Sequence, residues 1–443
     1  MMKFKITPPA LVAAGLALLC QPMEAQTPQL EAALQSLYDQ TDRQNATLQS
    51  LRTAVSEAQA AEGTTRMARL PEVSAQLSLS YLGDARLWNR QFGQGTTAPM
   101  PHFGNNFVLR AEQAVYTGGA LTASTQLARQ NSRMANLTAE EARQRVHFLL
   151  TAYYLQLHNL RNGQAVYAAN VRLARQMVEL MQKRRAQGVS LQNDITRYEL
   201  QLRQMELGET ALRDRQRIVL RQLATVLGSD SATCSLLGET AFDNLTVPDE
   251  SEAVWQERAL QQHLSLQKAS LEVDMGRTRE KTVRSEMLPH VALLAEDHLD
   301  GPITVEVPPL DRNLNYWFVG VGVSYNLSSL YKSRQKLRQS RLATTLAADR
   351  HTVALQQVGD AVHAAYVNLG TARTELDTRE TSVRLATENY DVVSQRYAGG
   401  LALVTDLTDA ASMKLDAELA LADARINLLY CYYQLRFAAC LFQ

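Results

Sequence analysis

Two aspartates occupy the same place in two similar stretches of the sequence, each a few residues after a glycine that interrupts a helical pattern. Asp194 follows Gly188, Asp406 follows Gly400, and Asp409 lies three residues further on. A carboxylate at the start of a helix accepts hydrogen bonds from free backbone amides and is favoured by the helix dipole. These side chains offer hydrogen bonding and ion pairing. Helix capping is the first interpretation for Asp194 and Asp406, and a gate or a partner contact is the second.

The sequence has no pattern for catalysis or for a bound cofactor. A Walker loop, an HExxH zinc motif, a Cys–His cluster and a Gly-x-Ser-x-Gly nucleophile motif are all absent from it. The eight histidines are scattered, and no pair has metal-ligand spacing. We therefore predict that the protein is not an enzyme and that it binds no cofactor and no metal.

The two aspartates belong to a tandem repeat. The segment Val171–Ala174, Val-Arg-Leu-Ala, recurs at Val383–Ala386, an offset of 212 residues. The same offset relates Gly188 to Gly400 and Asp194 to Asp406. Because it persists through a helix, its break and the next helix, each half should contain a helix–turn–helix tip. We expect the tip turns to use glycines with positive φ, namely Gly188, Gly399 and Gly400.

Each half also contains two stretches with the two-residue period of a β-strand. The first half has Val73–Tyr81 and Phe107–Tyr116, and the second has about His290–Leu299 and Tyr316–Asn326. Amphipathic strands of this length in a secreted protein indicate membrane-spanning β-strands. A half-buried strand of a soluble sheet is the alternative for any one of them. The expected lipid-facing side chains are Leu77, Leu79, Trp317, Val319, Val321 and Val323.

Long helices join these strands. We expect helices from Gly119 to Gly188 and from Ser329 to Ala398, each about 70 residues and about 105 Å long. Shorter helices are expected at 30–68, 189–227, 251–287 and 401–443, so that two of them, end to end, match one long helix. Four strands cannot close a barrel, whereas a trimer would supply twelve.

The chain ends and the charge place the protein in a broad class. Residues 1–25 have the basic start and short apolar core of a secretory signal, with cleavage after Ala25; acylation of Cys20 is the alternative. The 45 basic and 45 acidic residues balance, so no global field recruits nucleic acid. We divide the chain into the signal (1–25), a first repeat (26–228), a connector (229–250) and a second repeat (251–443).

The sequence resembles the outer membrane efflux protein (TolC) family from about Leu30 to Leu441. The resemblance is carried by the doubled Leu70-Pro71 and Leu288-Pro289, by Tyr-Thr-Gly-Gly at residues 116–119, and most specifically by the tip segment 395–410, QRYAGGLALVTDLTDA. It implies a mainly α protein with a transmembrane β-barrel: a homotrimer with a twelve-stranded barrel in the outer membrane of a Gram-negative bacterium and a long antiparallel α-helical barrel in the periplasm.

The resemblance also implies a passive duct of a tripartite efflux or type I secretion system. Its partners would be a periplasmic adaptor docking at the tips, where the turn glycines lie, and an inner-membrane transporter. In such ducts Tyr, Asp and Arg side chains hold the tip aperture shut, and by motif position the gate candidates here are Asp194, Tyr397, Asp406 and Asp409. Ala402 stands where the family pattern has an arginine, so one gate link is either missing or replaced by Arg184, Arg185 or Arg396, and the gate would then differ in chemistry. The alternative function is a periplasmic coiled-coil adaptor or scaffold without a membrane barrel.

Overall fold

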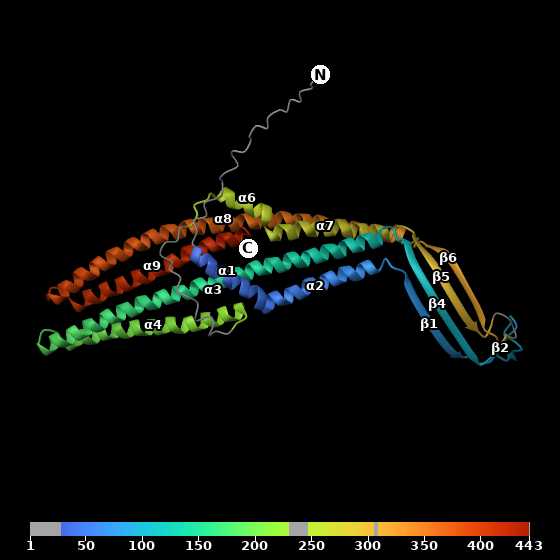
Figure 1. Ribbon diagram of the computed structural model, residues 1–443, viewed down its shortest axis with the longest axis horizontal. Helices are drawn as coiled ribbons and strands as arrows, with labels where there is room; N and C mark the ends of the chain where they lie inside the picture. Colours follow the sequence, from blue (N-terminus) through green and yellow to red (C-terminus); the bar gives the residue numbers. More distant parts are fainter. Residues whose placement is uncertain (1–27, 230–246, 305–308, 443) are drawn as a thin grey trace, which may run out of the picture.

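The computed structural model describes residues 28–229, 247–304 and 309–442 (Figure 1). The expected signal and most of the expected connector lie outside these residues. The described chain is an elongated helical bundle with a β-sheet at one end, and both helix–turn–helix tips lie at the opposite end (Figure 1). The strand-bearing end and the tips are therefore separated by the full length of the long helices.

The two halves have the same order of elements. In the first half, α1 (Pro28–Gln44) and α2 (Ala46–Met67) precede a hairpin, the long α3 (Ala120–Ala186) and α4 (Gln192–Leu227). In the second half, α6 (Glu252–Gln262) and α7 (Leu264–Ser285) precede a hairpin, the long α8 (Ser329–Ala398) and α9 (Val404–Ala438). The predicted long helices are confirmed at 67 and 70 residues. Among the described helices, none is both long and apolar enough to cross a membrane.

The shorter helices before the hairpins are each broken, and the prediction of uninterrupted helices over 30–68 and 251–287 was wrong. The breaks fall at Asn45 and His263, which are 218 residues apart, the same separation as the two Leu-Pro motifs. Asn45 Oδ1 accepts a hydrogen bond from the backbone N of Leu48 at 3.1 Å, and His263 Nδ1 accepts one from Ser265 at 3.2 Å. Both residues therefore cap the helix that follows them.

The break at Asn45 lies against the end of α4. Asn45 Nδ2 donates to the carbonyl oxygen of Val226 at 2.7 Å, and a Cβ on Gly228, whose φ is +68°, would lie 2.5 Å from the carbonyl oxygen of Gln44. In the second half, Cys440 adopts φ +60° at the position equivalent to Gly228, and its Sγ lies 3.4 Å from the backbone N of Leu264. Cys440 thus lies beyond the end of α9, although we expected it within that helix.

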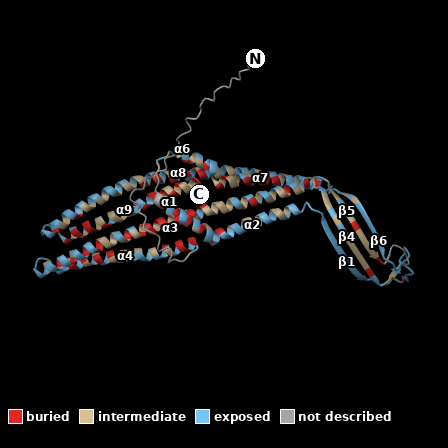
Figure 2. Cartoon of the chain, viewed as in Figure 1, coloured by how far each residue is buried: buried red, intermediate tan, exposed pale blue. Residues whose placement is uncertain are grey.

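The core of the bundle lies where these helices meet. Leu34, Leu150, Leu157 and Leu223 from α1, α3 and α4 are almost fully buried in one cluster with Tyr433 from α9. Figure 2 shows buried residues in stripes along the helices, while few residues of the strands are buried. The helices are therefore packed by amphipathic stripes, whereas no residue of the described strands belongs to the three core clusters.

The sheet has four antiparallel strands in the order β1–β4–β5–β6. They are β1 (Glu72–Tyr81), β4 (Phe103–Tyr116), β5 (His290–Gly301) and β6 (Leu314–Ser324). The pairing of β4 with β5 joins the hairpin of the first half to that of the second. A small hairpin of β2 (Ala85–Leu87) and β3 (Thr96–Ala98) lies in the first loop. β4 begins at Phe103 rather than at Phe107, and the other strand boundaries lie within about two residues of the predicted ones.

The strand register separates two faces of the sheet. Residues paired directly across strands share a face, and Val73, Ala111, Ala295 and Val319 form one such row. Odd-numbered residues of the four strands therefore make one face, which is mostly apolar. It includes all six predicted lipid-facing residues, every one of them exposed: Leu77, Leu79, Trp317, Val319, Val321 and Val323.

β5 is poorly patterned in sequence because it has adjacent acidic residues, Glu296 and Asp297. The register places Glu296 on the polar face and Asp297 on the apolar one. Asp297 lies opposite Trp317, towards the end of the sheet far from the helices, and Asn315 Nδ2 donates to it at 3.0 Å. The apolar face of β5 is thus interrupted by one carboxylate, which lies beside a tryptophan.

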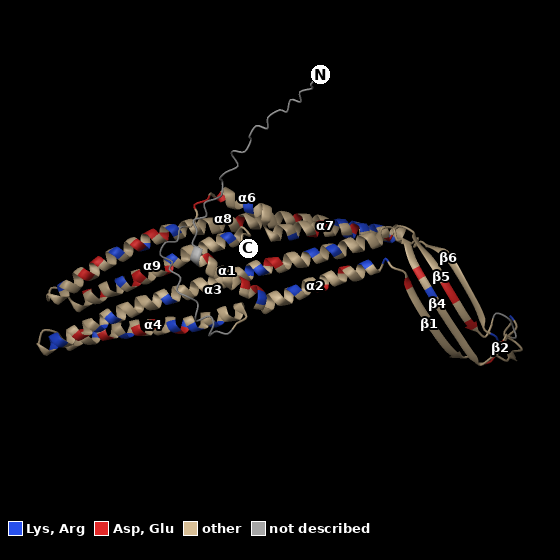
Figure 3. Cartoon of the chain, viewed as in Figure 1, with Lys and Arg blue, Asp and Glu red and all other residues tan. Residues whose placement is uncertain are grey.

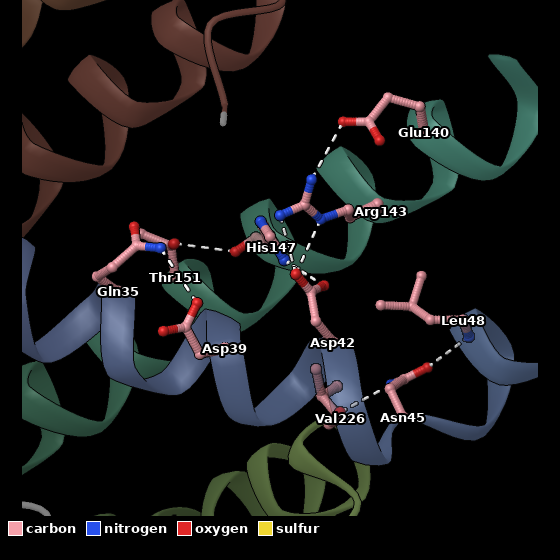
Figure 4. A network of polar contacts seen from close by, with 10 residues as sticks. All are labelled: Gln35, Asp39, Asp42, Asn45, Leu48, Glu140, Arg143, His147, Thr151 and Val226. Carbon is pink, nitrogen blue, oxygen red and sulfur yellow. Dashed lines mark hydrogen bonds and ion pairs between the residues drawn. The ribbon is translucent and has the colours of Figure 1, made fainter. Parts of the chain in front are cut away.

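A polar network fixes α1 on α3 inside the bundle (Figure 4). Arg143 Nε donates to Asp42 Oδ2 at 2.9 Å, and His147 Nε2 lies 2.9 Å from Asp42 Oδ1. Tyr38 stacks on the His147 ring with centroids 4.4 Å apart. Burial lowers the pKa of His147, although the neighbouring Asp42 carboxylate opposes this shift.

Acid should destabilise the bundle through its buried histidines. Burial lowers the pKa of His158 from 6.5 to about 4, so the unfolded chain binds this proton more readily than the folded chain. The contribution of neutral His158 to the free energy of unfolding is complete above pH 6.5 and is lost as the pH falls towards 4. Between pH 7 and 5 the free energy of unfolding should fall by about 2 kcal/mol per protomer. Melting temperatures of the detergent-solubilised protein should therefore drop across this range.

The matched variant is His158→Gln, which keeps a polar side chain but does not titrate near neutral pH. It should have a shallower dependence of melting temperature on pH than the parent protein. Equal slopes for the two proteins between pH 7 and 5 would contradict the assignment to His158.

Candidate functional site: the helical tips

The two tip turns have the same backbone hydrogen bonds. At the first tip the N of Val189 donates to the O of Arg184 at 2.9 Å; at the second the N of Leu401 donates to the O of Arg396 at 2.8 Å. Donors and acceptors are each related by the 212-residue offset. This six-to-one bond around a left-handed residue closes both helices in the Schellman manner.

Only one glycine at each tip is required by the backbone. Gly188 has φ +75° and Gly400 has φ +74°, as predicted. Gly399 has φ −82°, in the right-handed region, so the expectation of a positive φ there was wrong. Its counterpart in the first tip is Gln187, with φ −90°, which shows that this position accepts a side chain.

Tyr397 joins the two tips within one chain. Its side chain is buried, with 6% of its surface exposed, in a cluster that includes Met181 of α3 and Ile195 of α4. Burial raises the pKa of Tyr397, a hydrogen bond with Ser190 opposes the rise, and the nearby Asp194 carboxylate adds to it. The structure therefore brings Tyr397 and Asp194 together, two of the four gate candidates.

Arg184 crosses from the first tip to the second. Its Nη1 donates to the carbonyl oxygen of Tyr397 at 2.9 Å, and its Nη2 donates to that of Ala398. The guanidinium carbon also lies 5.6 Å from the centre of the Tyr397 ring. A cation here satisfies the last carbonyls of α8 and interacts favourably with the negative end of that helix. Three arginines were candidates to replace the arginine that the family pattern has at position 402. Of these, Arg184 makes the contact between the two tips.

The other two gate candidates lie on the surface of α9. Asp406 Oδ2 accepts a hydrogen bond from the N of Leu403 at 3.2 Å, which is the capping role. Asp409 is exposed one helical turn further on. Neither Asp406 nor Asp409 is part of the Tyr397 contact. The four predicted gate residues therefore divide into one pair between the tips, with Tyr397 buried and Asp194 half-buried, and one exposed pair on α9.

Four apolar side chains at the tips were not among the predicted site residues. Val189 and Leu191 are 69% and 71% exposed, and their repeat equivalents Leu401 and Leu403 are 73% and 69% exposed. The sequence contained a signal for this surface, because Val189 and Leu401, and likewise Leu191 and Leu403, are apolar residues at equivalent positions of the repeated turn. Apolar side chains exposed together at both tips make this surface a candidate contact site.

Comparison with known proteins agrees with this geometry. Residues 255–439 match the sequence model of the outer membrane efflux protein family. No curated protein is similar enough in sequence to match this chain.

Solved structures match the whole fold. The outer membrane protein VceC of Vibrio cholerae has a TM-score of 0.76 at 15% identity, covering 92% of this chain and 96% of its own. The CmeC outer membrane channel of Campylobacter jejuni has a TM-score of 0.77 at 15% identity, covering 99% and 94%. A membrane protein from Pseudomonas aeruginosa has a TM-score of 0.78 at 16% identity, covering 92% and 90%.

The family match and the shared fold together support the resemblance seen in the sequence. The similar structures include outer-membrane channels, and the helical tips and sheet occupy the two ends of this chain as one elongated unit. Residues 255–439 therefore match the outer membrane efflux protein family, and the described chain has the fold of solved outer-membrane channels such as CmeC.

Proposed function

We propose that the protein works as a homotrimer whose twelve strands close one barrel in the outer membrane and whose helices continue that barrel through the periplasm. It conducts substrates passively from an inner-membrane transporter, with a periplasmic adaptor at the tips. Residues 26–228 and 251–443 are two copies of one unit joined by a connector at 229–250. The shared order of elements and the equivalent tip turns support that division.

The proposal rests on the one-sided pairing of the edge strands and on the apolar face of the sheet. β1 and β6 each pair on one side only, so both edges present free backbone groups. The odd-numbered face between them is mostly apolar, and on β1 and β6 it is exposed. A copy of the chain at each edge closes the ladder, and lipid covers the apolar face.

Strand dimensions agree with a membrane span. β1 has 10 residues and β6 has 11, and a transmembrane strand tilted by about 45° needs roughly 9–11. The aromatic residues Tyr81, Phe103 and Trp317 lie on the apolar face towards the end remote from the helices. Aromatic side chains are favoured at both membrane interfaces. Because the helices leave the sheet at its other end, this aromatic end is assigned to the outer surface.

The adaptor alternative lacks comparable support. A scaffold without a membrane barrel would have no use for an exposed apolar sheet face with two open edges. The described strands form one such sheet and a small loop hairpin, both at the end opposite the tips.

Export should depend on the exposed apolar tips. Leu401→Asp combined with Leu403→Asp should abolish complementation of dye or drug export in cells that lack their own duct. Assembly in the outer membrane should remain, because both side chains are largely exposed and neither belongs to a core cluster. The parent protein should restore export when its pump and adaptor are supplied.

The matched control is Leu200→Asp with Leu207→Asp, two exposed leucines on α4 away from the tip turns. Export lost equally in the control would contradict a docking role for the tips. Full export by the tip variant would contradict the proposed adaptor contact.

A further inference from the structure

The polar face of the sheet has one tight charged cluster. Arg110 Nε donates to Glu296 Oε1 at 2.5 Å, and His298 Nε2 lies 2.8 Å from Glu296 Oε2. The His298 ring stacks on Tyr316 with centroids 4.7 Å apart and planes within 1°. Glu296 is buried by these neighbours, whereas the β5 residues on either side of it are half-buried.

The register puts this cluster inside the proposed barrel. Ser74, Arg110, Glu296 and Phe318 form one cross-strand row, and its members are even-numbered. If lipid covers the apolar odd-numbered face, the even-numbered face lines the lumen. Figure 3 shows the strand charges gathered on β4 and β5, with few on β1 and β6.

The lumen face has a large excess of negative charge. It has one guanidinium and four carboxylates, those of Glu72, Glu112, Glu296 and Asp300. With neutral histidines, the net charge of this face is −3 per protomer and −9 in a threefold assembly. The described polar face of the four strands has Arg110 as its only Lys or Arg.

This charge acts across the whole opening. Twelve strands about 4.8 Å apart and tilted by about 40° enclose a barrel of roughly 12 Å backbone radius, and side chains narrow the opening further. The Debye length is about 10 Å at 0.1 M salt, so no ion in the lumen is fully screened from the wall.

We propose that this lumen charge makes the outer-membrane barrel selective for cations, and that Glu296 and Arg110 are the residues that set the degree of selectivity. The inference rests on the proposed trimeric barrel. Glu296 pairs with Arg110 and so limits the repulsion that the guanidinium exerts on cations, while the other three carboxylates attract cations. Cationic solutes would leave the duct more readily than anionic solutes of the same size.

The test is the reversal potential of trimers reconstituted in planar bilayers under a KCl gradient at pH 8, where histidines carry little charge. The parent trimer should prefer K⁺ over Cl⁻. Glu296→Gln should lower the K⁺/Cl⁻ permeability ratio at least twofold, and Arg110→Gln should raise it. The double variant keeps the net charge of −3 per protomer and should return towards the parent ratio.

Asp297→Asn is the matched control, because it removes the adjacent carboxylate from the other face and should leave the ratio unchanged. Acidic tip residues also attract cations, but every variant here has the same tips. If Glu296→Gln does not assemble, Ser74→Arg makes the same change of charge in the same row and should also lower the ratio.

The outcomes separate this inference from the proposed function. Trimers that conduct with a ratio unaffected by Glu296→Gln, Arg110→Gln and Ser74→Arg, or that prefer Cl⁻, would overturn the selectivity proposal and leave the duct intact. Absence of trimers and of conductance in the parent protein would instead overturn the duct.

Discussion

Val319→Arg should prevent assembly in the outer membrane, whereas Gly320→Arg should permit it. The two residues are neighbours on β6, but Val319 points from the exposed apolar face and Gly320 from the polar one. An arginine facing lipid near the bilayer midplane costs about 2–4 kcal/mol, and a trimer would contain three of them. An arginine facing water in the lumen has no such cost.

Gly320 is the appropriate control because there is room for a new side chain at this position. A Cβ at Gly320 would have no atom within 4 Å, whereas one at Gly322 would lie 2.9 Å from Leu294 Cδ1. Assembly is measured as the amount of detergent-extracted trimer in separated outer membranes. Val321→Arg should behave as Val319→Arg does, and equal tolerance at positions 319, 320 and 321 would contradict the assignment of the two faces.

Arg184→Ala should open the periplasmic tip. The change removes two charge-assisted hydrogen bonds to the end of α8, from Arg184 to Tyr397 and Ala398, and the cation over the Tyr397 ring. Such bonds are each worth about 1.5–3 kcal/mol, less where solvent reaches them. We expect single-channel conductance to rise several-fold and cells to become sensitive to large hydrophilic antibiotics.

Two companion variants sharpen this test. Arg184→Lys keeps the charge but not the paired donor geometry, so its conductance should lie between those of the parent and Arg184→Ala. Arg185→Ala removes an exposed neighbouring arginine and should leave conductance unchanged. Parent-like conductance in Arg184→Ala would show that the contact between the tips does not restrict the opening.

The sequence predicted the long elements well because their signals are strong and local. The α8 boundaries agree with the prediction at Ser329 and Ala398, and α4 ends at Gly228 with the left-handed conformation expected of a C-terminal glycine. The apolar face of β6 followed from simple alternation, and the repeat offset located both tip turns.

The errors lie where local signals are weak or tertiary contacts decide. The breaks at Asn45 and His263 have no Pro or Gly at the cap, and Asn45 is tied to Val226, which is 181 residues away in sequence. β4 begins before Phe107 because Gly104, Asn105 and Asn106 pair with β1 despite their low strand propensity.

The site was predicted only in part for the same reason. Spacing grouped Asp406 and Asp409 with Tyr397, but the fold leaves both aspartates exposed on α9. The link from Arg184 to the second tip spans 213 residues and depends on how the two hairpins pack. The faces of Glu296 and Asp297 needed the strand register, because adjacent acidic residues give no alternation to follow.

The native mass of the protein extracted with detergent from separated outer membranes tests the proposed duct most directly. We predict an outer-membrane particle with about three times the mass of the chain, which is 49.3 kDa at its full 443 residues. A soluble periplasmic monomer would contradict the barrel, because the free edges of β1 and β6 would then remain unpaired.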